Sequence, residues 1–310
     1  MNLQISSSPH TRDSSETKRI MLDVIIALAP ALLVSIYFFG LRSLSVIAIT
    51  VASAVLTEYV ARKIMKRDNT IFDLSAIVTG VLLAMSLPPT IPFWICVIGS
   101  VIAIGVVKQM YGGIGNNFVN PAIAARIVLA VSFPTHMNKW TIGTDLVTTA
   151  TPLDFLRKGA DNLPSYWQLF IGDKGGCLGE VSVLALLIGA AYLIYRKVIK
   201  IWIPLSFIGT TLIIVAIAGK DPLFHVLSGG LVIGAFFMAT DYVTSPLTNK
   251  GKIIFGIGCG LITGIIRLYS GMAEGVSFSI LIMNIVTPHI DNYTIPISFG
   301  GGKKRAKKED

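Results

Sequence analysis

Residues 20–40, IMLDVIIALAPALLVSIYFFG, decide the fold class, because Asp23 is the only charged residue in this stretch. A helix of about 20 such residues crosses the roughly 30 Å hydrocarbon core of a bilayer. No small-residue cleavage signal follows the stretch, so it does not have the form of a signal peptide. We therefore predict a membrane span, preceded by a polar cytoplasmic tail at residues 1–18.

Similar apolar stretches recur along the whole chain. Hydrophobic residues make up 53% and charged residues 14% of the 310 residues, whereas soluble domains contain about 25% charged residues. The mean hydropathy is +0.71. A lone strand in lipid would leave its backbone groups unpaired, so we predict an all-α polytopic membrane protein. The ten predicted transmembrane helices are residues 20–40, 43–61, 71–87, 91–108, 119–134, 179–196, 199–218, 222–239, 252–269 and 274–290.

The basic residues predict the orientation of these spans. With the N-terminus inside, 18 of the 26 Lys and Arg residues fall on the cytoplasmic side and 7 on the other, while Arg126 lies within a span. This asymmetry is typical of a chain with both ends cytoplasmic and the loop 135–178 outside. The basic C-terminal tail is interpreted as an orientation signal and solvated charge, not as a nucleic-acid site.

The two halves of the chain resemble each other in four short motifs that keep the same order. The matched pairs are Leu74-Ser75 with Met85 against Leu227-Ser228 with Met238, and Tyr111 to Phe118 against Tyr269 to Phe278. Five spans is an odd number, so a duplicated half must run through the bilayer in the opposite direction. The predicted organisation is a tail at 1–18, a first five-helix repeat at 19–134, an extracytoplasmic loop at 135–178, an inverted second repeat at 179–292 and a basic cytoplasmic tail at 293–310.

The loop contains the sequence DLVTTAT, from Asp145 to Thr151. A threonine hydroxyl can attack the pyrophosphate of FAD, displace AMP and end as a phosphoester to FMN, a phosphoryl transfer that depends on positioning and charge neutralisation. The small neighbours Thr149 and Ala150 leave room for a transferase. The alternative is an ordinary turn, because Ser and Thr before proline favour turns.

Other candidate residues leave their alternatives open. Arg126 has three interpretations. It binds an anion such as a flavin phosphate, it pairs with Asp73 or Asp241, or its side chain snorkels to the membrane edge. The connector from Gly112 to Pro121 lines a re-entrant segment, an ion path or a second flavin site, or simply breaks the helix. It lacks the strand context of a dinucleotide fingerprint. The three cysteines lack metal-ligand spacing, so no metal site is predicted.

Four segments along the chain resemble one family, which includes the D subunits of the Rnf electron-transport complex and the B subunits of the sodium-pumping NADH:quinone reductase. They are YGGIGNNFVNPA (111–122), DLVTTATPL (145–153), MATDYVTSPLTNKGK (238–252) and EGVSFSILIMN (274–284). The third of these spans the polar connector before residue 252. The family commonly has Ser-Gly-Ala-Thr at its flavinylation site, where this chain has Thr148-Thr149-Ala150-Thr151. The acceptor threonine is kept.

The resemblance implies covalent FMN on Thr151, with Asp145, Thr148, Thr149 and Ala150 as the flavinylation motif. It implies a flavin transferase as maturation partner, acting outside the cytoplasm of a bacterium. It also implies an electron-carrier subunit of an ion-translocating ferredoxin:NAD oxidoreductase in the cell (inner) membrane, beside membrane and flavin/iron–sulfur subunits, with Na⁺ or H⁺ as the ion. A second, non-covalent flavin between the helix halves is possible, and no catalytic residue is expected in this chain. The alternative function is a solute channel or transporter on the same inverted repeat.

Overall fold

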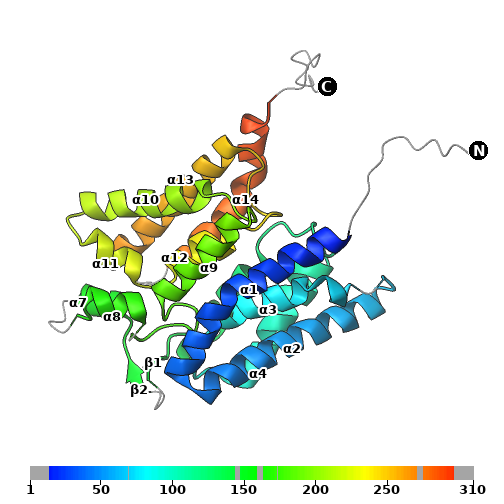
Figure 1. Cartoon of the computed structure of the whole chain (residues 1–310), viewed down its shortest axis with the longest axis horizontal. Helices are drawn as coiled ribbons and strands as arrows, with labels where there is room; N and C mark the ends of the chain where they lie inside the picture. The colour runs from blue at the N-terminus through cyan, green and yellow to red at the C-terminus, as the bar shows by residue number, and fades with distance from the viewer. Residues whose placement is uncertain are drawn as a thin grey trace, which may run out of the picture.

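The computed structural model describes residues 14–68, 70–143, 147–158, 163–172, 174–270 and 275–296, and every predicted span is helical there (Figure 1). The all-α polytopic prediction is therefore confirmed. The spans are formed by α1 (Ser14–Phe39), α2 (Leu41–Ile64), η1 (Ile71–Asp73) with α3 (Ser75–Met85), α4 (Phe93–Ser100) with the π-helix η2 (Val101–Gln109), α5 (Pro121–Ser132), α9 (Val183–Tyr195), α10 (Trp202–Ile217), α11 (Pro222–Leu227) with α12 (Leu231–Ile233) and the π-helix η3 (Gly234–Met238), α13 (Asn249–Tyr269) and α14 (Val276–Thr294).

Several spans are interrupted before they could cross a bilayer. Among the described residues, three helices are long and apolar enough to cross by themselves: Thr17–Phe39, Leu41–Ile64 and Asn249–Tyr269. The 11 residues of α3 rise only about 16 Å, roughly half of the hydrocarbon core. The sequence Leu87-Pro88-Pro89 follows, and proline cannot continue a helix because it lacks the N–H donor.

Protein groups satisfy the backbone where α3 ends. The N–H of Gly179 donates to Met85 O at 2.7 Å, and the N–H of Leu178 donates to Leu87 O at 3.1 Å. Arg126 Nε donates to Ser86 O at 3.1 Å. Irregular backbone at membrane depth is tolerated where protein supplies such partners. The segment around Leu178 and Gly179, just before the second repeat, therefore supplies hydrogen-bond donors to the backbone at the end of α3.

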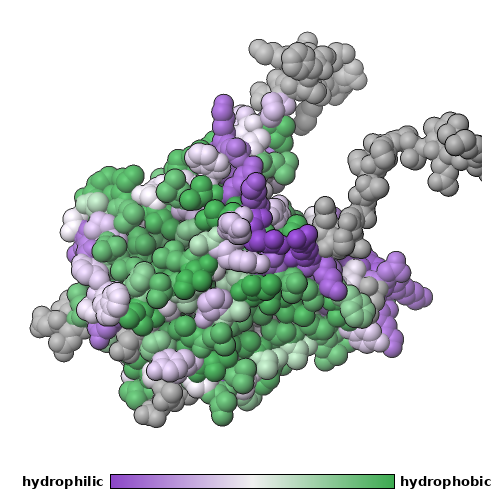
Figure 2. Space-filling model, in the orientation of Figure 1, coloured by the Kyte–Doolittle hydropathy of each residue, from purple (hydrophilic) through white to green (hydrophobic). Residues whose placement is uncertain are grey.

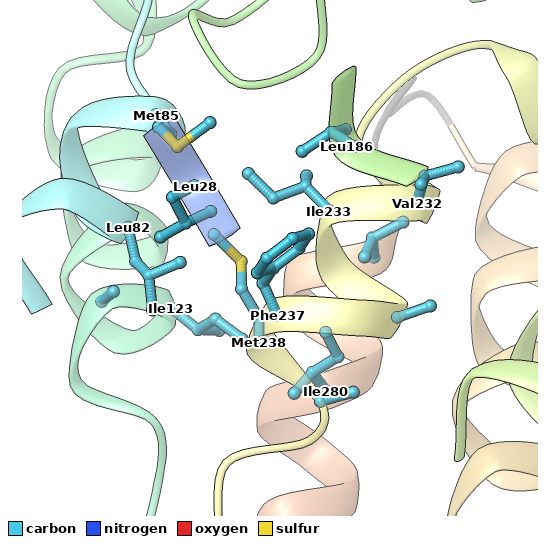
Figure 3. Packing of buried hydrophobic residues seen from close by; sticks show 14 of the residues in the cluster. Leu28, Leu82, Met85, Ile123, Leu186, Val232, Ile233, Phe237, Met238 and Ile280 are labelled. Atoms are coloured by element: carbon cyan, nitrogen blue, oxygen red, sulfur yellow. The ribbon is translucent and has the colours of Figure 1, made fainter. Parts of the chain in front are cut away.

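The two repeats pack in matching ways, as an internal two-fold relation requires. The second span of each half lies along the fourth: α2 along α4 and η2, and α10 along α13. The first spans of the two halves contact each other, α1 on α9, and so do the last, α5 on α14. Met85 and Met238, matched by sequence, belong to one buried core between the halves (Figure 3). The core shown there also includes Leu28, Leu82, Ile123, Leu186, Val232, Ile233, Phe237 and Ile280.

The outer surface separates apolar from polar residues. Figure 2 shows hydrophobic residues over the outward faces of the helices, and hydrophilic residues along the edge that carries the start of α1 and the ends of α2 and α14. The hairpin of β1 (Trp140–Ile142) and β2 (Val147–Thr149) lies at the opposite edge in Figure 1. This arrangement suits the predicted topology, in which the loop and the chain ends lie on opposite sides of the membrane.

The contact between α1 and α9 depends on Gly189. A Cβ atom there would lie 2.0 Å from Ala27 O, whereas a Cβ at Gly209 of α10 would meet nothing within 4 Å. We expect Gly189→Ala to lower the free energy of unfolding by about 1–3 kcal/mol or more through overpacking. Thermal unfolding in detergent measures it, with Gly209→Ala as the matched control. Equal midpoints for the two variants would contradict this account of the interface.

Candidate functional site

The predicted loop is folded. It contains α6 (Pro134–Met137), the β1–β2 hairpin, α7 (Pro152–Lys158) and α8 (Tyr166–Ile171). In the antiparallel hairpin Trp140 pairs with Thr149, and Thr141 pairs with Thr148. The hairpin therefore holds Thr148 and Thr149 of the predicted flavinylation motif in extended conformation. Asp145 lies outside the described residues.

Thr151 occupies the start of α7. Its Oγ1 accepts a hydrogen bond from the N–H of Asp154 at 3.2 Å, and Pro152 follows at the first helical position. This is the usual arrangement at a helix N-terminus, where a Thr oxygen satisfies a free backbone N–H. The Thr151 side chain is 4% exposed, whereas Thr148 is exposed and Thr149 and Ala150 are half-buried. The predicted acceptor is thus buried at the end of an accessible strand.

A cleft of about 400 Å³ opens beside this segment, within the roughly 300–1,000 Å³ range of small-molecule sites. The cleft is lined by Ile142, Thr149, Ala150, Pro152, Phe155, Leu163, Pro164, Gln168, Lys174 and Gly175. Residues on both sides of Thr151 contribute to it. Phe155 supplies an aromatic ring, and Gln168 and Lys174 supply polar groups. This composition fits a planar ligand that also carries an anionic group.

Local sequence signals build the wall formed by α8. Ser165 and Gln168 make a capping box: Gln168 N–H donates to Ser165 Oγ at 3.3 Å, and Ser165 N–H donates to Gln168 Oε1 at 2.8 Å. Such reciprocal bonds fix the start of a helix. The Tyr166 hydroxyl donates to Asp221 Oδ2, just before α11. The wall is therefore anchored to the second repeat.

Gly175 brings the next segment of the chain against the hairpin. A Cβ atom there would lie 2.4 Å from Thr149 Cγ2 and 3.4 Å from Ala150 O. A side chain at this position would push the two segments apart, because real Cβ atoms do not approach other heavy atoms this closely. The absence of a side chain therefore places Lys174 directly beside the predicted flavinylation motif.

Lys174 is a buried cation in the cleft. Its side chain is 3% exposed, and its Nζ donates to Leu227 O at 2.5 Å. The pKa of Lys174 is lowered to about 8, mainly by burial; Glu180 opposes this shift and Arg267 adds to it. Among the described residues no carboxylate lies within ion-pair distance of its ammonium.

Arg126 lies in a different cavity, between the repeats. Its side chain is 9% exposed, with Nη1 donating to Ser277 Oγ at 2.6 Å and Nη2 close to Cys177 Sγ at 3.7 Å. A small cavity of about 20 Å³ includes Arg126 and Glu180 in its lining. The buried guanidinium does not snorkel to the membrane edge. Its role toward a flavin stays a prediction.

The connector from Gly112 to Pro121 starts a helix and also lines a cavity, while its role in an ion path or a second flavin site stays a prediction. Asn120 caps α5 by accepting from the N–H groups of Ala122 and Ile123, and its Nδ2 donates to Met238 O at 3.1 Å. It is therefore a helix-starting connector. Asn117 and Asn120 also line a third cavity, of about 110 Å³, and so do Lys108, Asp241 and Tyr242.

Metal ligands do not cluster in the described part of the chain. No group of three or more His, Cys, Asp or Glu side chains lies there in position to hold a metal ion. Cys96, Cys177 and Cys259 are free and buried.

The sequence predicted the motif but not the cleft. Phe155, Gln168 and Lys174 were not predicted, because their place beside Thr149 depends on the hairpin, the anchored α8 and the close approach of Gly175. The one signal in the sequence was a charged residue next to two glycines, Gly175 and Gly176. That signal does not show whether a lysine is buried.

Comparison with known proteins places the chain in a family. The profile of the NQR2, RnfD, RnfE family matches residues 4–300. The chain is 53% identical over 314 residues to the D subunit of the Na(+)-translocating ferredoxin:NAD(+) oxidoreductase complex of Acetobacterium woodii, covering 100% of this chain and 98% of that protein. It is 46% identical over 316 residues to the D subunit of the proton-translocating ferredoxin:NAD(+) oxidoreductase complex of Clostridium ljungdahlii, covering 96% of each. It is 36% identical over 352 residues to the D subunit of the ion-translocating oxidoreductase complex of Escherichia coli K12, covering 98% of this chain and 100% of that protein. The chain therefore belongs to the NQR2, RnfD, RnfE family, with D subunits of ion-translocating oxidoreductase complexes among its relatives.

Proposed function

We propose that this chain carries FMN, linked to Thr151 through a phosphoester, and passes electrons within an ion-translocating ferredoxin:NAD⁺ oxidoreductase complex. The observation that carries the proposal is the cleft beside Thr151, with Phe155 on its lining and a buried ammonium at Lys174. The names of the two ferredoxin-dependent relatives support the reaction class. One of those names gives Na⁺ as the ion and the other gives the proton.

The attachment reaction balances with FAD as the flavin donor. The Thr151 oxygen forms a bond to the FMN phosphorus, the pyrophosphate bond of FAD breaks, AMP leaves and the hydroxyl proton is released. A transferase needs access to the hydroxyl, which is 4% exposed and accepts the Asp154 N–H. Attachment therefore requires the start of α7 to open. The exposed strand residue Thr148 gives a transferase a place to hold the segment.

The residues of the cleft bind and orient the flavin, and FMN supplies one- and two-electron redox chemistry when bound. Phe155 offers an aromatic face to a planar ring, since aromatic rings stack favourably. The side-chain NH₂ of Gln168 is a hydrogen-bond donor, because its Oε1 is already engaged by Ser165. The chain then needs no acid–base catalyst of its own.

A second, non-covalent flavin would lie in the cavity that Asn117, Asn120 and Tyr242 line. That cavity measures about 110 Å³, against about 400 Å³ for the cleft beside Thr151, so it would have to widen to hold a flavin. Its remaining lining is largely apolar, and it lies between elements of both repeats. We expect purified Thr151→Ala protein to keep one flavin that acid extraction releases. A protein without extractable flavin would contradict this second site.

The proposed setting is the bacterial cell membrane. The chain ends would be cytoplasmic and the flavin loop extracytoplasmic, where the transferase would act, and other membrane and flavin/iron–sulfur subunits of the complex would exchange electrons with it. The hairpin lies at the edge opposite to the start of α1 and the end of α14 (Figure 1), which supports this arrangement.

A denaturing gel viewed under ultraviolet light tests the proposal. The chain is co-expressed with a flavin transferase, and a second flavinylated substrate controls for transferase activity. We expect a fluorescent band at 33.3 kDa. A dark band beside a fluorescent control would contradict the carrier function and favour a solute channel or transporter on the same fold.

A further inference from the structure

Lys174 is buried, and no carboxylate lies within ion-pair distance of it in the described part of the chain, which does not include its neighbour Asp173. An ammonium has three donors, and within the described residues one of them is used, in the bond to Leu227 O. Burying an unpaired charge costs several kcal/mol in general. The same side chain lines the cleft together with Ala150 and Pro152, which flank Thr151.

The described residues around Lys174 carry an excess of positive charge. Arg267 is 7% exposed, and its hydrogen bonds within the described residues go to carbonyl groups: Nη1 to His225 O and Nη2 to Ser228 O at 3.2 Å. Glu180, 6% exposed, is the nearby anion that acts on both cations. Among the described residues, the buried cations Lys174 and Arg267 thus lie near one buried carboxylate, that of Glu180. An anionic ligand group in the cleft would restore the balance.

We propose that Lys174 binds the phosphate of the flavin attached at Thr151, forming an ammonium–phosphate ion pair inside the cleft. The inference rests on the proposed function, because it needs a flavin at Thr151. It assigns the phosphate to this part of the cleft, at the end where Gly175 contacts Thr149 and Ala150. The ring would then extend toward Phe155 and α8.

A structural role competes with this proposal. Leu227 is the last residue of α11, so the Lys174 ammonium also caps the end of that helix, and cations are favourable at helix C-termini. If Lys174 only caps α11, its ammonium lies near Leu227 O and does not contact the flavin phosphate. The experiment must therefore read out the phosphate itself.

Flavin attachment and ³¹P NMR together supply that readout. Wild type, Lys174→Met, Lys174→Arg and Lys139→Met are each co-expressed with the transferase, Lys139 being an exposed lysine of the same loop. We expect attachment to slow about tenfold or more in Lys174→Met, since a hydrogen bond to a charged group is lost. Lys174→Arg keeps the charge and should retain most of the attachment, and Lys139→Met should match wild type.

In the flavin-bearing wild type, the phosphorus resonance should shift with pH as Lys174 titrates. The phosphodiester itself stays ionised from neutral to alkaline pH, so a pH-dependent phosphorus shift reports the titration of a neighbouring group, here Lys174. The pKa of Lys174, about 8 without a ligand, should rise beside the phosphate, because the anion favours the charged amine. The other groups near Lys174, Glu180 and Arg267, are present in every variant, and the shift should vanish in Lys174→Met.

The possible outcomes separate the two proposals. If wild-type protein carries no flavin, the proposed function, covalent FMN on Thr151, is contradicted. A normally flavinylated Lys174→Met protein that keeps the pH-dependent shift overturns only the role of Lys174. If Lys174→Met does not fold, wild type and Lys174→Arg decide, because a phosphorus resonance without pH dependence in wild type also overturns the ion pair.

Discussion

Replacing Thr151 with alanine is expected to abolish the covalent flavin, so that gel fluorescence of the 33.3 kDa band falls to background. The reason is chemical: a phosphoester at this position needs the Thr151 oxygen. The fold should survive, because the lost bond to the Asp154 N–H is one helix cap, worth about 1 kcal/mol. Thermal unfolding of the same sample separates loss of flavin from loss of fold.

Three further variants serve as controls for this result. Thr151→Ser keeps a hydroxyl and the cap, and should keep part or all of the fluorescence. Thr148→Ala and Thr149→Ala change the neighbouring threonines of strand β2, and both should remain fluorescent. If Thr151→Ala still fluoresces while Thr148→Ala or Thr149→Ala is dark, the acceptor has been assigned to the wrong hydroxyl.

Replacing Lys108 with methionine is expected to lower the free energy of unfolding by about 3–5 kcal/mol, the usual effect of breaking a buried ion pair. Lys108 Nζ lies 3.0 Å from Glu58 Oε2, with side chains 4% and 0% exposed. The ammonium also donates to Ser75 Oγ at 2.5 Å, and Gln109 Nε2 donates to Glu58 Oε1 at 2.9 Å. Without Lys108 the buried carboxylate loses its counter-charge and the hydrogen bonds from the ammonium to both of its oxygens.

The matched control for Lys108→Met is the double variant Glu58→Gln with Lys108→Met. It removes both charges, so it should recover most of the lost stability, since replacing a buried pair by neutral groups is often close to neutral. Denaturant or thermal unfolding in detergent measures all of these variants. A double variant as unstable as Lys108→Met alone would show that packing, not unpaired charge, causes the loss.

The helical spans could be predicted because each depends on a local run of apolar residues. The interruption of α3 had a partial local signal in Pro88 and Pro89, but its depth depends on distant partners. Gly179 and Arg126, far along the chain, satisfy the carbonyls where this helix ends. Such contacts, like the close approach of Gly189 to Ala27, follow from the packing of the two repeats and are not visible in a single stretch of sequence.

The candidate site, too, was predictable only where its residues are contiguous in the sequence. The motif around Thr151 is contiguous, so the sequence carries it whole, and the family assignment made from it is confirmed by the match over residues 4–300. The binding surface is assembled from segments that meet only in three dimensions, with Phe155 on α7, Gln168 on α8 and Lys174 beyond it. Burial of Lys174 changes its chemistry, and burial is a property of the folded loop.

The most direct test of the central claim is the mass of the intact protein, purified after co-expression with an active flavin transferase. We predict an increase equal to one phosphoester-linked FMN, which peptide mapping assigns to the segment that contains Thr151. The increase should be absent in Thr151→Ala. An unmodified mass, with the transferase active on its control substrate, would contradict the account.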